Sequence, residues 1–133
     1  MYRRLFPDQR TVIEWFAFVE PSGRCRVQEF ITQLEDEERG KLTARMIAWA
    51  QHGNWNTTIS AVRRLQNTNP PVYEIKSHQE RVLFIRCRND AVAIEAFSKK
   101  GNEWGNREHN LFKAAQPLFA AAEAECKRGP KYD

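Results

Sequence analysis

The chain has 133 residues, of which 41% are hydrophobic, so it is long enough to bury one core and too short for several domains. Its 21 lysines and arginines outnumber its 17 aspartates and glutamates. This balance favours a polyanionic partner such as nucleic acid, although charge alone leaves an acidic protein partner open. The sequence contains no apolar signal-peptide core and no run of transmembrane length, so we expect a cytoplasmic protein without membrane contact.

The three cysteines, Cys25, Cys87 and Cys126, are odd in number and widely spaced. None of them forms a CxxC pair, and none has a histidine at the spacing typical of metal ligands. We therefore expect no metal site, no cofactor and no disulfide, as is usual for proteins of a reducing cytosol.

The N-terminal half predicts one strand and two helices. Residues 11–19 carry apolar side chains on both faces of a predicted strand, which is typical of an interior strand. Residues 24–39 place Val27, Phe30, Ile31 and Leu34 at helical spacing and predict an amphipathic helix. We expect Gly40 to separate it from a second helix over residues 41–52, which ends at Gly53.

The C-terminal half predicts an ordered loop over residues 54–69 and then three short strands. The strands are expected at residues 72–76, 81–88 and 91–98, because these runs are rich in residues that favour a pleated sheet. Residues 88–90 supply the turn between the last two strands.

The last predicted element is a helix over residues 106–126. Pro117 is expected to kink this helix or to split it, and residues 127–133 are expected to form a frayed tail. The resulting order β-α-α-β-β-β-α predicts one α+β domain over residues 1–133 with a mostly antiparallel sheet. We expect the first strand to insert beside the last strand of the meander, and the helices to cover one face of the sheet.

Basic residues gather at one end of the predicted meander. Arg81 begins the second strand and Lys99 and Lys100 follow the third, so an antiparallel pair places them at the same end. The neighbouring strand and the preceding loop add Glu74, Lys76, Arg63 and Arg64. Fixed cations of this kind stabilise the charge that develops when a ribose 2′-OH attacks its own phosphate, and crowding by cations lowers the pKa of a lysine that acts as base or acid.

Simpler interpretations of the same residues remain open at this point. Two lysines before a polar loop also occur at many solvated strand ends, and Arg81 can form a surface ion pair with Glu74 or Glu80. Trp104 can be a core residue or a surface on which a base stacks.

Several motifs of this half of the chain resemble a known family. Residues 72–76 (VYEIK), 80–84 (ERVLF) and 96–100 (AFSKK), together with Arg107-Glu108, resemble the C-terminal half of the RelE/ParE toxin superfamily, in its HigB-like, phage-derived branch. The resemblance covers about residues 59–116. It implies the RelE-like fold and a toxin of a type II toxin–antitoxin pair, which cleaves mRNA on the ribosome without a metal.

The resemblance also implies roles for individual residues. Arg81 matches the arginine that contacts the scissile phosphate, and Lys99 and Lys100 match the paired catalytic lysines. Arg64 matches a basic residue of the RNA-facing surface, and Glu74 matches a position that orients Arg81. The other residues that we assign to RNA binding are Arg63, Lys76, Arg86 and Trp104.

The chain departs from the family pattern in three places. Lys76 stands where the family usually has arginine, Gly105-Asn106 replaces the usual Thr-Pro before the last helix, and the C-terminal tyrosine or histidine of several relatives has no clear counterpart. Two alternatives therefore accompany the nuclease hypothesis: a ParE-type inhibitor of DNA gyrase, and a degenerate prophage domain that binds RNA or protein. The partners implied for a nuclease toxin are mRNA, the ribosome and a helix-turn-helix antitoxin.

Overall fold

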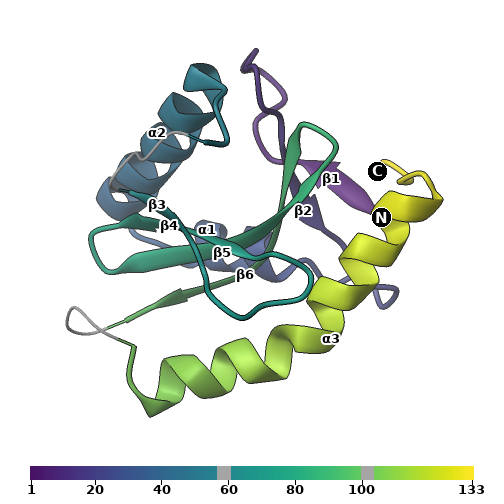
Figure 1. Cartoon of the computed structure of the whole chain (residues 1–133). Helices are drawn as coiled ribbons and strands as arrows, with labels where there is room; N and C mark the ends of the chain where they lie inside the picture. Colours follow the sequence, from purple (N-terminus) through teal and green to yellow (C-terminus); the bar gives the residue numbers. More distant parts are fainter. Residues whose placement is uncertain (57–60, 100–103) are drawn as a thin grey trace.

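The computed structural model describes residues 1–56, 61–99 and 104–133 and shows an α+β fold (Figure 1). Its elements are β1 (Tyr2–Arg4), β2 (Trp15–Phe18), α1 (Arg26–Gln33), α2 (Asp36–His52), β3 (Val62–Arg64), β4 (Tyr73–Ser77), β5 (Glu80–Cys87), β6 (Asp90–Ser98) and α3 (Asn106–Arg128). Each bound of the three strands of the predicted meander lies within one residue of its expected position.

The described strands form one sheet in the order β1-β2-β6-β5-β4-β3. β2 pairs with β6 in parallel, and every other neighbouring pair is antiparallel. The prediction that the first strand inserts beside the last strand of the meander is confirmed. The reason is the burial of the whole of β2, which only an interior strand achieves.

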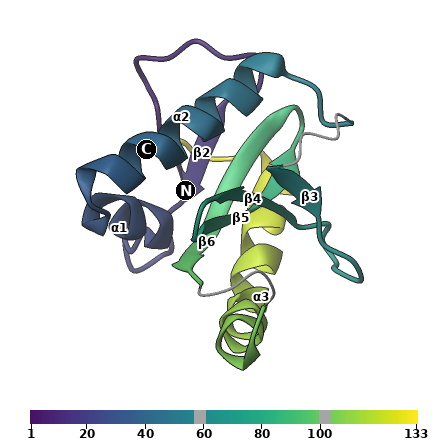
Figure 2. The ribbon, with the colours of Figure 1, turned by 90° about the vertical axis from the view of Figure 1, so that its left-hand side faces the viewer.

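Helices cover both faces of the sheet (Figure 2). The core under α1 and α2 includes Trp15, Leu42, Met46, Trp49 and Phe84. The core under α3 includes Phe16, Leu83, Ile85, Ile94 and Phe119. The prediction that all helices pack on one face is therefore wrong, because β2, β5 and β6 carry large apolar side chains on both of their faces and each face needs cover.

The two ends of the chain lie side by side and pair with each other (Figure 1). The backbone N–H of Tyr2 donates to the carbonyl oxygen of Lys131, and that of Asp133 donates to the carbonyl oxygen of Tyr2, each at 2.8 Å. The buried Tyr2 hydroxyl also donates to the carbonyl oxygen of Ala122 at 2.7 Å. The prediction of a frayed tail over residues 127–133 is wrong for the residues that pair here, because β1 was not expected and supplies their partner.

The boundary between the first two helices lies before Gly40 and not at it. α1 ends at Gln33, and α2 runs from Asp36 through Gly40 without a break. Three acidic residues in its first turn stabilise the positive end of the α2 dipole. The Arg39 guanidinium donates to the carbonyl oxygen of Ile31 near the end of α1, at 3.0 Å, and so satisfies a helix end. A glycine inside a helix lowers helix stability by only about 1 kcal/mol relative to alanine. The acidic first turn and the Arg39 hydrogen bond outweigh this loss.

The segment after α2 contains more structure than predicted. α2 ends at Gly53, as expected, with a left-handed φ of 71°. Within the expected loop, residues 57–60 lie outside the described part, and Val62–Arg64 form the edge strand β3. The loop prediction is wrong for β3, because a three-residue strand with two arginines has almost no periodic signal.

Helix α3 is one continuous helix of 23 residues with Pro117 inside it, so of the two outcomes expected at Pro117, a kink or a split, the split is wrong. Ala115, Phe119 and Ala122 are buried against the sheet on either side of the proline. This packing compensates for the backbone hydrogen bond that the proline cannot make.

A disulfide joins Cys87, at the end of β5, to Cys126, near the end of α3. The expectation that the chain has no disulfide is wrong. The two residues are 39 positions apart in the sequence, but the packing of α3 across the sheet brings their Cα atoms to 5.8 Å, within the range that a disulfide requires. Cys25 is a buried free thiol.

Among the described residues, none of the helices combines the length and the apolar character that crossing a membrane requires.

Candidate functional site

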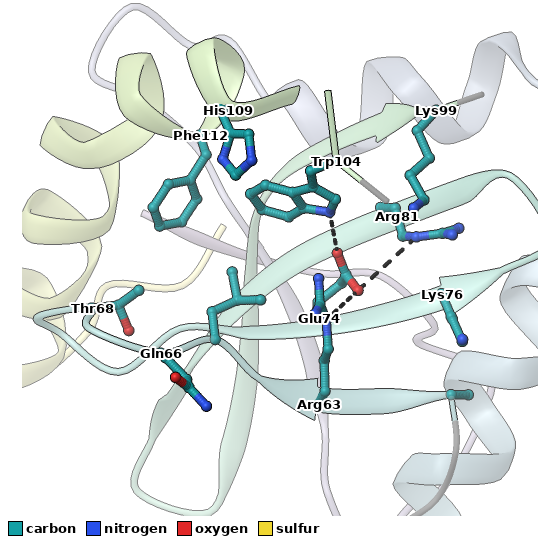
Figure 3. Close-up of a pocket in the computed structure, with 12 residues that line it drawn as sticks. Arg63, Gln66, Thr68, Glu74, Lys76, Arg81, Lys99, Trp104, His109 and Phe112 are labelled. Carbon is teal, nitrogen blue, oxygen red and sulfur yellow. Dashed lines mark hydrogen bonds and ion pairs between the residues drawn. The ribbon is translucent and has the colours of Figure 1, made fainter. Parts of the chain in front are cut away.

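A pocket of about 590 Å³ lies on the α3 face of the sheet, where β3, β4, β5 and the end of β6 meet the start of α3 (Figure 3). Its lining residues are Ala61, Arg63, Leu65, Gln66, Thr68, Glu74, Lys76, Arg81, Lys99, Trp104, His109 and Phe112. We call this space the α3 pocket.

Strand register places the charged residues of the α3 pocket. Arg63 lies opposite Glu74, and Lys76 lies opposite Arg81, so side chains of three strands point to the same face. The N–H of Lys99 donates to the carbonyl oxygen of Gln79 at 2.9 Å, which continues the pairing of β6 past its last strand residue. The prediction that Arg81 and Lys99 lie at the same end of the sheet is confirmed.

The Glu74 carboxylate lies at the centre of the cluster and is 2% exposed. Its Oε1 accepts a hydrogen bond from Nε of Arg63, and its Oε2 accepts one from Nε1 of Trp104, both at 2.9 Å. Nε of Arg81 lies 4.0 Å from Oε1 (Figure 3). One buried carboxylate thus orients two guanidinium groups and one indole ring.

Arg81 is 6% exposed and is bound to the backbone. Its Nη1 donates to the carbonyl oxygens of His78 and Glu80 at 2.7 and 2.9 Å. Burial lowers the pKa of Arg81 and the Glu74 charge opposes that shift, but a guanidinium stays charged at any working pH. Arg81 is therefore a fixed cation of the pocket and also a support of the β4–β5 turn.

Lys99 is 3% exposed, which is rare for a lysine. Burial lowers the pKa of its ammonium group, and the neighbouring charge of Arg81 lowers it further. No ion pair joins Lys99 to a carboxylate in the part of the chain that the structure describes. A lysine in this state is suited to give and accept protons.

Aromatic residues form the other wall of the α3 pocket. The Trp104 ring lies 5.4 Å from the ring of His109 and 5.6 Å from those of Phe97 and Phe112, between centroids. Cζ of Arg63 lies over the Trp104 ring at 5.9 Å from its centroid. Sequence reasoning named Trp104 but missed His109 and Phe112. Their i, i+3 spacing in the first turns of α3 was the available signal, but the direction in which the helix faces was not known.

The remaining predicted residues are dispersed. Lys76 lines the α3 pocket, whereas Arg64 is exposed at the end of β3 and does not line it. Arg86 lies on the opposite face of the sheet, where its Cζ is 5.0 Å above the Trp55 ring centroid. Lys100 lies outside the described residues.

Within the described ranges, no group of three or more His, Cys, Asp or Glu side chains is placed to hold a metal ion. The sequence matches no model of a known protein family. It also matches no curated protein.

Proposed function

We propose that this chain is the toxin of a type II toxin–antitoxin pair and acts as a metal-independent mRNA endoribonuclease. The observation that carries the proposal is the buried Lys99, whose pKa is lowered, beside the fixed cation Arg81 in an open pocket. Fixed cations and a lysine that can lose its proton meet the needs of phosphodiester transfer from a ribose 2′-OH.

The arrangement of elements supports a RelE-like assignment. The series β2-α1-α2-β4-β5-β6-α3 follows the expected order β-α-α-β-β-β-α. The additional strands β1 and β3 lie at the two edges of the sheet, where strands can be added without changing the core.

In the proposed reaction, neutral Lys99 takes the proton of the 2′-OH, and the 2′-oxygen attacks the adjacent phosphorus. Arg81, Arg63 and Lys76 stabilise the negative charge of the phosphorane. The bond between phosphorus and the 5′-oxygen then breaks, which leaves a 2′,3′-cyclic phosphate on one fragment.

The leaving 5′-oxygen needs a proton, and His109 is the group that we assign to this step. It lines the same pocket as Lys99 but comes from the opposite wall. Histidine is the side chain most often used for proton transfer. The products are thus a 2′,3′-cyclic phosphate and a free 5′-hydroxyl, with no water or metal consumed.

The proposed partners are a translated mRNA on the ribosome and a helix-turn-helix antitoxin. The open side of the α3 pocket carries Arg63, whose side chain is 60% exposed. An antitoxin that places acidic residues over this opening would prevent RNA from entering the pocket and would neutralise its cations.

Induced expression in a bacterial host, with primer extension on abundant mRNAs, tests the proposal. We expect new 5′ ends inside translated frames with the wild type, and none with Lys99→Met. Lys41→Met is the matched control, since Lys41 is an exposed lysine that pairs with Glu37 on its own helix. Lys99→Met is preferred to Arg81→Ala, because loss of the Arg81 backbone contacts also weakens the fold.

Two outcomes would overturn the nuclease proposal. Growth arrest with intact messages and accumulated gyrase-cleaved DNA would indicate a ParE-type inhibitor. Absence of any growth effect, with the folded protein present in the cells, would indicate a binding domain without toxin activity.

A further inference from the structure

We propose that the α3 pocket binds one unpaired nucleotide, with its base against Trp104 and its 3′-phosphate at Lys99 and Arg81. The inference rests on the proposed nuclease function and names the subsite that would select the cleavage position. The base that is read belongs to the nucleotide on the 5′ side of the cleaved bond, because that nucleotide supplies the attacking 2′-OH.

The α3 pocket has two chemically different halves. One half is cationic and contains Arg63, Lys76, Arg81 and Lys99. The other half is apolar and aromatic and contains Leu65, Trp104, His109 and Phe112. A phosphate alone would use only the first half, whereas a nucleoside 3′-phosphate matches both. The volume of about 590 Å³ lies in the range of about 300–1,000 Å³ that is typical of small-ligand sites.

Trp104 is held as a fixed platform. Its Nε1–H is bound to Glu74, and three aromatic rings surround it at 5.4 to 5.6 Å. A ring that is fixed before binding loses little entropy when a base stacks on it. Base–aromatic stacking contributes roughly 1–3 kcal/mol per base.

Arg63 supplies the second side of the base site. Its Cζ lies over the Trp104 ring at 5.9 Å, which is longer than a stacking contact, and the side chain is 60% exposed, so the guanidinium can turn outward about its Nε hydrogen bond to Glu74. Guanidinium planes stack on bases as aromatic rings do. A base that enters from the open side would therefore lie between the indole and the guanidinium.

Polar groups at the rim supply base selection. Gln66 and Thr68 line the pocket from the loop after β3 (Figure 3). A glutamine amide donates and accepts a hydrogen bond at the same time, and it forms paired hydrogen bonds with adenine. Adenosine 3′-monophosphate is therefore the probe that we choose.

Calorimetric titration of the purified protein with adenosine 3′-monophosphate and with inorganic phosphate, at constant ionic strength, tests the subsite. We expect the nucleotide to bind about tenfold more tightly than phosphate. Trp104→Leu should remove this gain, so that the nucleotide and phosphate bind the variant with affinities equal within about twofold. Trp55→Leu is the matched control, because Trp55 also lies under an arginine but on the opposite face of the sheet.

A second measurement keeps the test valid if Trp104→Leu does not fold. In the wild type, the NMR resonance of the Trp104 indole N–H should shift clearly more on titration with the nucleotide than on titration with phosphate. Equal affinity for both ligands, or a nucleotide gain that survives in Trp104→Leu, would overturn the base subsite. If the protein cleaves RNA but shows no preference for the nucleotide over phosphate, only the subsite proposal is wrong. If it binds the nucleotide but does not cleave RNA, the nuclease proposal is wrong.

Discussion

The indole N–H of Trp104 donates a hydrogen bond to Oε2 of Glu74 at 2.9 Å, and this contact joins the segment before α3 to strand β4. The same carboxylate accepts a hydrogen bond from Arg63 through its other oxygen. The aromatic wall and the cationic wall of the α3 pocket therefore share one buried anion. A change at Glu74 should affect both walls together.

Glu74→Gln should destabilise the fold by about 1–3 kcal/mol. The glutamine can still accept a hydrogen bond from Trp104, but it removes the negative charge between Arg63 and Arg81. Urea denaturation of the two proteins measures the free energy of unfolding. Glu29→Gln is the control, because Glu29 pairs with Arg24 at an exposed site, and it should change stability by less than about 0.5 kcal/mol. Equal effects of the two substitutions would show that Glu74 has no special role.

In His109→Ala, which removes the group assigned to protonate the 5′-oxygen, the residual RNA cleavage rate should rise with pH through a midpoint below 10.5, the ordinary pKa of a lysine side chain. Burial, and then the charge of Arg81, lower the pKa of Lys99, so its neutral form appears at lower pH than usual. Single-turnover cleavage from about pH 6 to about pH 10 measures this profile. Lys99→Arg keeps the charge but cannot lose a proton, and it should reduce the rate at least about 100-fold. An unchanged pH profile in Lys99→Arg would exclude Lys99 as the base.

Cys126→Ala should lower the free energy of unfolding by about 2–4 kcal/mol under oxidising conditions. The disulfide with Cys87 closes a long loop, with a sequence separation of 39, and so restricts the unfolded chain. Urea denaturation with and without a thiol reductant measures the effect. The difference from the wild type should shrink strongly once the reductant is present. Cys25→Ala, which removes a free thiol, should show the same change in stability with and without reductant.

Glu80→Gln should stabilise the protein at neutral pH by about 1 kcal/mol. Burial, followed by the charge of Glu38 among the raising effects, raises the pKa of Glu80 above its ordinary 4.5. Its Oε1 is buried without a hydrogen-bond partner among the described residues. The folded wild type binds a proton here more readily than the unfolded chain, so it gains stability as the pH falls through the raised pKa.

The glutamine variant has no carboxyl group at this position and gains nothing from proton binding. Its excess in free energy of unfolding over the wild type should therefore be largest at neutral pH and should shrink as the solution becomes acidic. Thermal or urea unfolding at a series of pH values measures the difference. An advantage that grows toward acid pH would contradict the raised pKa of Glu80.

The sequence predicted the parts of the fold that depend on local pattern. The alternation of residues along β5 placed Arg81 with Leu83 and apart from Arg86, and the structure confirms this division. The antiparallel meander then brought Lys99 beside Arg81. The two-sided apolar character of β2 also predicted its interior place in the sheet.

The parts that the sequence did not predict depend on how distant elements pack. The rotation of α3 about its axis decides whether His109 and Phe112 face solvent or the pocket, and helical spacing leaves that rotation open. The approach of Cys87 to Cys126 likewise follows from the path of α3 across the sheet. β1 and β3 are too short to show a periodic pattern in the sequence, so they can be recognised as strands only by their pairing with β2 and β4 in the structure.

The pairing of the chain ends affects how this sheet can associate. β1 and β3 are the edges of the sheet, and the outward N–H and C=O groups of Tyr2 in β1 already bind residues 131 and 133. Of the strands that the structure describes, β3 thus has the more open edge. A fibre built by strand pairing needs two free edges in every molecule, whereas one edge supports a single self-complementary contact. Strand pairing between copies of this protein should therefore favour a closed dimer through β3 over a chain that also uses the partly covered edge of β1.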